Sequence, residues 1–389
     1  FLNTGRKNGS QERIQRLRDK ADKALMLSTF NIGRANDNNG ERKHFEYLGN
    51  GGIMEFKSSN HPHKKLIDCV DNSETGCADV WTFAELYSDN MPIDFFDYTQ
   101  DLEIYDYKDV LKWCTSVLEQ SPSARVMLGE AIEKDWMITL EDLRGGDYCL
   151  DVENKILVLD NNALVPSALI RSTYFRNITL VTLTKALRDI WQEKRHGGFD
   201  EDYAPAHVLL MERIRAADLD VIALLVGWEL RSENSPEVWR HMIGSEIGDM
   251  AMAFSGHLER DPSAQFNGHG LLAAFKQWFR EAARVNRCDH DTLEYLDEVL
   301  ATSDLINPFG QKTPGKMHIE ILSCLPDKTA YLQGQGAEML SDPMYSSVDD
   351  DINQTHLFHI MHDLEAVVVE NVPFRDPDLA RKIFPVDTE

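Results

Sequence analysis

Six charged side chains on two successive segments of the chain are the strongest candidates for a functional site: Lys185, Arg188, Asp189, Asp218, Asp220 and Glu229. Asp218 and Glu229 are eleven residues apart, about three turns of a helix, so they share one helix face. Asp220 directly precedes an apolar run, and a carboxylate buried without a partner costs several kcal/mol. We therefore expect either a structural network of ion pairs or a polar cleft between the two segments.

Other residues could bind a metal ion at a different place. His356, His359 and His362 follow each other at spacings of three, so on a helix adjacent pairs could share a metal. Glu246 and Asp249 are also three apart and suit a carboxylate pair. The alternative interpretation is that the histidines are partly exposed side chains packed beside apolar neighbours. The two carboxylates would then belong to a solvated helix face.

Three common catalytic motifs are absent from the sequence. The 13 histidines include no pair four apart, so there is no His-Glu-x-x-His zinc motif, and there is no G-x-S-x-G. Residues 310–317, GQKTPGKM, match G-x-x-x-x-G-K, but Met317 replaces the hydroxyl residue that would hold magnesium. The segment after this stretch, 317–322, has the alternation of a strand where a phosphate loop needs a helix. A phosphate loop is therefore not expected.

The segments that position the six charged side chains are predicted to be two long helices, 174–194 and 206–231. The second half of the latter, DVIALLVGWEL, is apolar on nearly all sides, which predicts a central buried helix. The flanking elements are predicted as helices at 109–118 and 121–136, a strand at 137–143, a hairpin at 147–160, helices from 235 and at 247–258, 271–285 and 291–301, a strand at 317–322 and a last helix at 356–368.

The predicted fold class is α+β and mostly helical. We expect three regions: an irregular region with short strands at 1–105, a helical core at 106–305, and an extension with a strand and a helix at 306–389. The first region includes an amphipathic segment at about 11–27.

Composition excludes some classes of partner. The chain has 65 acidic and 40 basic residues, a formal net charge of −25, whereas nucleic acids and anionic membranes require a basic face. No segment has the roughly 20 mostly apolar residues of a membrane span, and the first residues, FLNTGRKNGS, do not have the pattern of a secretory signal. The six cysteines form no C-x-x-C pair, which favours free thiols in the cytoplasm.

Three stretches carry a resemblance to a known family: YFRNITLVTLTKALRDIWQEKR, AADLDVIALLVGWELR and VWRHMIGSEIGDMA. They resemble a bacterial family of unknown function named for putative metallopeptidases, with a zincin-like core of two long helices beside a small sheet. The resemblance covers about residues 120–260. It implies that the first long helix should carry the zinc motif.

The resemblance implies a register for that helix. In related zincin-like domains a Trp-Gln pair follows the zinc motif, and Trp191 and Gln192 stand in its place. Lys185 and Asp189 then fall at the two ligand positions, and Ala186 falls at the position of the general base. Lysine is a cation at neutral pH and alanine cannot take a proton from water, so a zinc site with three protein ligands is not expected here.

The same resemblance implies an acidic third ligand on the second helix, where Asp218 or Asp220 fits. We therefore hypothesise that Lys185, Arg188 or both occupy the place of the metal and pair with these carboxylates. The chain would then be non-hydrolytic, with no cofactor, and would bind a peptide or protein partner. Two alternatives remain: an active zinc hydrolase with ligands elsewhere, drawn from the residues named above and His241, or an assembly protein.

Overall fold

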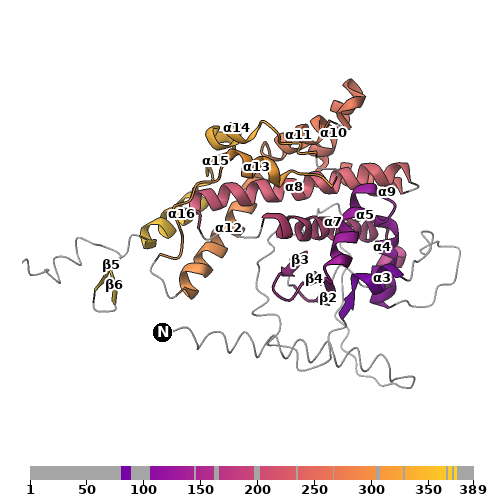
Figure 1. The fold of residues 1–389 in the computed structure, drawn as a ribbon, viewed down its shortest axis with the longest axis horizontal. Helices are drawn as coiled ribbons and strands as arrows, with labels where there is room; N and C mark the ends of the chain where they lie inside the picture. Colours follow the sequence, from indigo (N-terminus) through magenta and orange to yellow (C-terminus); the bar gives the residue numbers. More distant parts are fainter. Residues whose placement is uncertain are drawn as a thin grey trace, which may run out of the picture.

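The computed structural model describes residues 80–88, 106–143, 146–161, 166–196, 202–233, 235–265, 267–303, 307–326 and 329–364, with two further strands at 367–369 and 372–374. Two long helices, α7 (Thr173–His196) and α8 (Pro205–Ser232), run side by side through its centre (Figure 1). The predicted segment at 11–27 lies outside the described residues. The observed fold is mostly helical α+β, as predicted.

A small mixed sheet lies beside α7. Its strands are β1 (Val80–Thr82), β2 (Met137–Glu141), β4 (Ile156–Asp160) and β3 (Tyr148–Asp151), in that spatial order. β2 and β4 are parallel, and the other two pairs are antiparallel. β3 and β4 form the predicted hairpin. β1, which lies in the predicted N-terminal region, pairs with β2 and so belongs to the same sheet.

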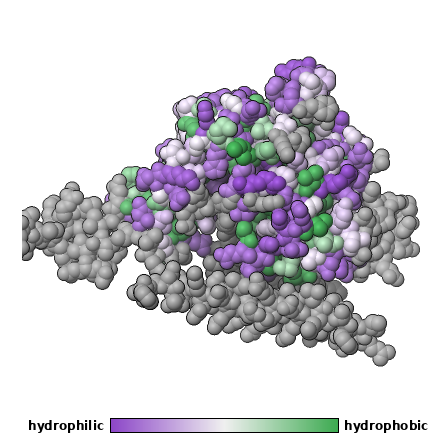
Figure 2. Space-filling view, viewed as in Figure 1, coloured by the Kyte–Doolittle hydropathy of each residue, from purple (hydrophilic) through white to green (hydrophobic). Residues whose placement is uncertain are grey.

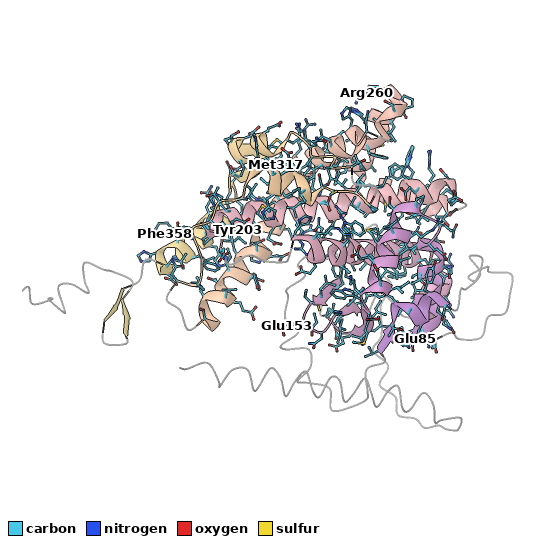
Figure 3. The ribbon with its side chains drawn as sticks, in the orientation of Figure 1. Glu85, Glu153, Tyr203, Arg260, Met317 and Phe358 are labelled. Atoms are coloured by element: carbon cyan, nitrogen blue, oxygen red, sulfur yellow. The ribbon has the colours of Figure 1, made fainter. Side chains whose placement is uncertain are left out.

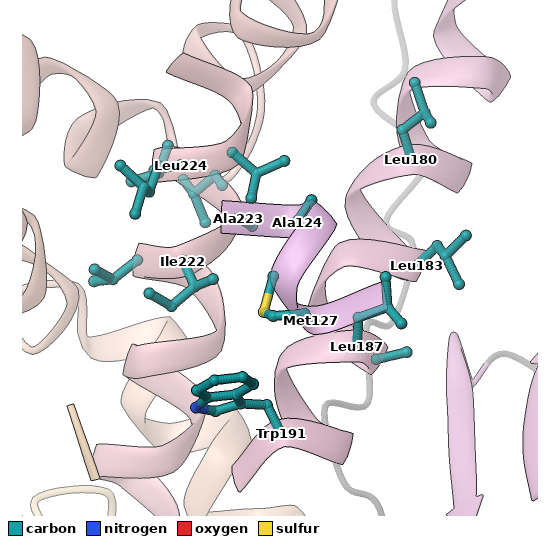
Figure 4. Close-up of a cluster of buried hydrophobic side chains, with 14 of the residues drawn as sticks. Ala124, Met127, Leu180, Leu183, Leu187, Trp191, Ile222, Ala223 and Leu224 are labelled. Atoms are coloured by element: carbon teal, nitrogen blue, oxygen red, sulfur yellow. The ribbon is translucent and has the colours of Figure 1, made fainter. Parts of the chain in front are cut away.

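Three helices precede the hairpin: α3 (Phe83–Ser88), α4 (Tyr107–Leu118) and α5 (Pro122–Glu133). Asp106 and Ser121 cap α4 and α5, because each side chain accepts a hydrogen bond from a backbone N–H of the first turn. α5 packs against both long helices, and Ala124 and Met127 lie between them in Figure 4. A short helix, α6 (Pro166–Arg171), then leads into α7.

The prediction that α8 is central and buried is confirmed. α7 lies on one side of it, and α9 (Pro236–Ile243), α11 (His269–Trp278) and α12 (Ala282–Thr302) are among the helices that cover its other sides (Figure 1). Its apolar residues Val221, Ile222, Leu224 and Val226 are all at most 1% exposed. The charged residues in the middle of this helix, Arg213, Arg215, Asp218 and Asp220, are buried with it.

The remaining helices are α10 (Gly248–Arg260), a 3-10 turn at Pro262–Gln265, α13 (Lys316–Leu322), α14 (Gly336–Ser341), α15 (Pro343–Ser346) and α16 (Asp351–Leu364), and two short strands follow, β5 (Val367–Val369) and β6 (Val372–Phe374). α13 and α15 pack on α8, and α16 packs on α12. Residues 316–346, which the sequence assigned to a C-terminal extension, therefore contact the helical core directly.

Three predicted elements were wrong. Residues 317–322 form helix α13 and not a strand: Ile319 and Leu322 face the core, whereas Met317 and Ile321, four residues apart, are 57% and 47% exposed. Segment 271–285 spans two helices, because α11 ends at Trp278 and Glu281 caps the start of α12. The last helix begins at Asp351 and ends at Leu364, so the predicted end at 368 falls in β5.

Two further expectations concern the described residues only. None of the helices within the described ranges is long and apolar enough to cross a membrane. Cys114, Cys149, Cys288 and Cys324, the cysteines in the described ranges, form no disulfide, and the first three are buried.

Candidate functional site

Asp218, in the middle of α8, is the centre of a buried polar network. Its carboxylate accepts hydrogen bonds from Arg188 Nε at 2.6 Å and Nη2 at 3.2 Å, from Tyr331 Oη at 2.6 Å, and from Gln192 Nε2. Asp218, Arg188 and Gln192 are fully buried. Burial and the neighbouring carboxylate raise the pKa of Tyr331 well above its usual value, so the phenol keeps its proton and acts as a donor.

Arg188 also contacts the segment that follows α13. Its Nη2 donates to the carbonyl of Leu322 at 3.1 Å, and its Nη1 donates to the carbonyl of Cys324 at 3.0 Å. The planar guanidinium has five N–H donors, so it can bind a carboxylate and two carbonyls at once. Arg188 therefore connects α7, α8 and the end of α13.

Asp189, one residue further along α7, forms a second ion pair with α8. It accepts hydrogen bonds from Arg215 Nη2 at 2.6 Å and Nε at 2.9 Å. Arg215 also contacts Glu193 at 3.0 Å, and Tyr148 of β3 donates to Asp189 at 3.3 Å. Asp189 is fully buried, and Arg215 balances its negative charge.

Asp220 forms the third pair. Lys185 Nζ lies 2.6 Å from Oδ1, and Trp278 Nε1 donates to Oδ2 at 2.9 Å. Burial alone lowers the pKa of Lys185, but the charge of Asp220, its hydrogen bond and the more distant Asp147 and Glu246 outweigh burial, so the pKa is raised. The ion pair between Lys185 and Asp220 therefore stabilises the folded protein fully at pH values below 10.5, the usual pKa of lysine. This stabilisation is lost only when the pH rises through the higher pKa that Lys185 has in the folded protein.

The Asp220→Ala variant is expected to lower the free energy of unfolding by about 2 kcal/mol, because it leaves the Lys185 ammonium and the Trp278 N–H without their partner. The loss stays below that of a fully buried pair, since 12% of the Lys185 side chain is accessible to water. Urea denaturation measures it. A loss below about 0.5 kcal/mol, the usual range at surface sites, would contradict burial of Asp220.

The three pairs balance in charge and leave no place that suits zinc. Three cations face three carboxylates: Lys185, Arg188 and Arg215 against Asp189, Asp218 and Asp220. Of the register positions implied by the zincin resemblance, the first holds an ammonium group, the second holds the fully buried methyl group of Ala186, and the third is paired with Arg215. Zinc needs deprotonated ligands and is repelled by an adjacent ammonium, so these residues do not fit the ion.

Glu229, the sixth candidate, does not belong to this network. Its carboxylate accepts hydrogen bonds from Ser123 Oγ at 2.7 Å, from the Ser123 backbone N–H at 3.0 Å, and from Ser121 Oγ. It therefore caps the first turn of α5, where a negative charge is favourable. The sequence predicted that Glu229 shares a helix face with Asp218, but its hydrogen bonds are to the start of α5 and not to the Asp218 network.

A second buried network was missed by the sequence analysis. Arg213 of α8 forms a bidentate pair with Asp289 of α12 at 2.6 and 2.7 Å. The same guanidinium donates to the carbonyls of Tyr345 at 2.7 Å and Ser347 at 2.8 Å. The only sequence signal was an arginine within an apolar helix, which does not identify a partner 76 residues away.

The alternative metal ligands are dispersed in the structure. Arg287 pairs with Glu246 at 2.9 Å, and Arg284 pairs with Asp249 at 2.7 Å, so both carboxylates bind arginines of α12. His356 Nε2 lies 2.5 Å from Asp297 Oδ2. His359 and His362 are exposed on α16, with His362 stacked on Phe358.

His241 is half-buried and packs against Tyr174 at 5.2 Å between ring centroids. Throughout the described ranges, no group of three or more His, Cys, Asp or Glu side chains is arranged to hold a metal ion.

Comparisons with known proteins give one family. Neither a curated protein nor a solved structure matches the chain significantly. Residues 98–332 match a family described as "Putative metallopeptidase family (DUF6782)", a stretch that is more than half of the chain. The match begins before α4 and ends directly after Tyr331, so it contains every residue of the Asp218 network. The chain is therefore a member of this family of unknown function.

Proposed function

We propose that this chain is a non-hydrolytic member of its family, in which two buried ion pairs take the place of a catalytic zinc ion. The observation that carries the proposal is the contact of Lys185 with Asp220 and of Arg188 with Asp218, both between α7 and α8. Together the two cations supply two positive charges to two carboxylates, as one divalent ion would. Activation of a water molecule also needs a base, and Ala186 has no basic group.

The function that remains is the binding of a peptide or protein partner. The network itself is closed to a partner, because Asp218, Asp189 and Arg188 are fully buried. A partner would bind the outer surface, where α16 exposes three large apolar side chains: Ile352 at 73%, Phe358 at 67% and Met361 at 42%. Phe358 is labelled in Figure 3. Elsewhere on the face shown in Figure 2, hydrophilic residues predominate. Phe358 and Met361 are three residues apart and so are neighbours on the helix surface, and exposed apolar side chains that lie together are typical of protein contacts.

The test is the metal content and chelator response of the purified full-length chain. We expect less than about a tenth of an equivalent of zinc by inductively coupled plasma mass spectrometry, because two cations already neutralise the carboxylates. We also expect an unchanged melting temperature after EDTA treatment, since removal of a ligand lowers stability only if the native state binds it. Stoichiometric zinc together with a lower melting temperature in EDTA would instead favour an active hydrolase.

A further inference from the structure

Helix α16 uses little of its surface for packing within the chain. Of its 14 residues, Asn353 and Ile360 are buried. Ile360 belongs to an apolar cluster that includes side chains of α12, and Asn353 Nδ2 donates to the carbonyl of Asn286 at 2.8 Å. His356 Nε2 adds a contact of 2.5 Å with Asp297. A helix of this length is marginal in water unless it packs, so the contacts with α12 hold α16 in place and leave its opposite side to solvent.

The solvent side of α16 carries apolar and aromatic side chains. Phe358 precedes the buried Ile360 by two residues, which places it nearly opposite on the helix, and it is 67% exposed (labelled in Figure 3). Met361, three residues after Phe358, is 42% exposed. The ring of His362 lies parallel to that of Phe358, with 6.2 Å between the centroids. We call Phe358, Met361 and His362 together the Phe358 surface.

The charges beside the Phe358 surface are acidic. Asp351 is exposed and precedes Phe358 by seven residues, which is about two turns, so it lies on the same side of the helix about 10 Å away. Asp349, just before the helix, is also exposed. Within the described ranges, neither of these two carboxylates takes part in an ion pair. The sequence has no lysine or arginine at 329–374 or at 288–302, the later part of α12.

We propose that the Phe358 surface binds a basic amphipathic helix of a partner protein. This inference rests on the proposed function and names the chemistry of its partner. The apolar side of such a helix covers Phe358 and Met361, as in other complexes in which one helix lies along an apolar surface. A lysine or arginine about two turns from that apolar contact reaches Asp351. An arginine can also stack its planar guanidinium on the exposed ring of Phe358.

Charge selects this partner over a second copy of the chain. Each copy has a formal net charge of −25, so two copies repel each other, whereas a basic helix is attracted to the carboxylates of Asp349 and Asp351. The Phe358 surface also lies beyond the stretch that matches the family, which ends at residue 332. Binding here therefore does not depend on whether a metal lies between α7 and α8.

The test measures binding of a fluorescein-labelled synthetic peptide to the full-length chain by fluorescence anisotropy. The peptide has about 18 residues, about five helical turns, with leucine on one side of the helix and arginine on the other. We expect saturable binding that Phe358→Ser weakens at least about tenfold, because the leucines lose their apolar contact. Asp351→Lys should weaken it by a similar factor, because it places a like charge against the arginines. Both residues are exposed, so the melting temperatures of the two variants should match that of the wild type.

Two matched controls separate this surface from general effects. Met317→Ser removes an apolar side chain of α13 that is 57% exposed, and Glu153→Lys makes the same change of charge as Asp351→Lys in the exposed turn between β3 and β4. Both controls should leave the peptide affinity unchanged.

Three results would overturn the proposal. The first is the absence of binding, or an affinity that Phe358→Ser and Asp351→Lys change no more than the controls do. The second is equal binding of a peptide with glutamate in place of arginine. The third is a dimer of the chain alone in analytical ultracentrifugation that Phe358→Ser dissociates, which would assign the surface to a second copy. Zinc content tests the proposed loss of hydrolysis separately, so failure of one proposal is distinguishable from failure of the other.

Discussion

The Arg188→Gln variant is expected to lose about 4 kcal/mol of unfolding free energy. The substitution removes the cation from the buried carboxylate of Asp218, and breaking one partner of a buried pair typically costs about 3–5 kcal/mol. It also leaves the carbonyls of Leu322 and Cys324 without their donor. Urea denaturation monitored by circular dichroism gives the value from the transition midpoint and slope.

The matched control for this variant is Arg240→Gln. Arg240 pairs with Glu237 at 3.6 Å on the surface of α9, and its side chain is 71% exposed. Exposed pairs of this kind contribute little, so the control should lose less than about 0.5 kcal/mol. An Arg188→Gln loss as small as that of the control would mean that Arg188 is solvated, and the buried network would then be wrong.

The Arg213→Gln variant is expected to lose a similar amount, again about 4 kcal/mol, for the same physical reason. Burial raises the pKa of Asp289 although Arg213 acts to lower it, so desolvation outweighs the attraction between the two. Such a pair adds little net stability, yet removal of one partner leaves a buried charge unpaired. The double variant Arg213→Met with Asp289→Leu should therefore lose less than the single variant.

Hydrogen exchange separates the two arginines. Arg213→Gln should increase deuterium uptake near residues 345–347, whose carbonyls Arg213 binds, whereas Arg188→Gln should increase it near residues 322–324. If both variants increased deuterium uptake uniformly over the chain, the two arginines would not each stabilise the particular segment whose carbonyls they bind. If the double variant were less stable than Arg213→Gln, the pair would be a net stabilising interaction.

The sequence predicted the ion pairs between the two long helices for a simple reason. Asp220 precedes an apolar run in a helix that must be buried on all sides, so a cation had to come from the neighbouring helix, and Lys185 supplies it. The sequence left open which of Lys185 and Arg188 pairs with which of Asp218 and Asp220. Tyr331 and the two carbonyls bound by Arg188 could not be predicted, because they lie more than 100 residues away in the chain.

The errors in secondary structure also have physical causes. Met317, Ile319 and Ile321 alternate with polar residues as in a strand, and only the packing of Ile319 against the core decides for a helix. The break between α11 and α12 contains no glycine or proline, so no local signal marked it. Carboxylates such as Glu246 and Asp249 could not be assigned from spacing, because their partners are arginines of a later helix.

The central claim is that cations of the chain itself, and not a metal, neutralise Asp218 and Asp220. The most direct measurement is an anomalous difference map, collected on both sides of the zinc edge, from crystals of full-length protein grown with zinc. We expect no peak between α7 and α8, and density that joins Lys185 to Asp220. A zinc peak within about 2.2 Å of either carboxylate, with Lys185 displaced, would contradict it.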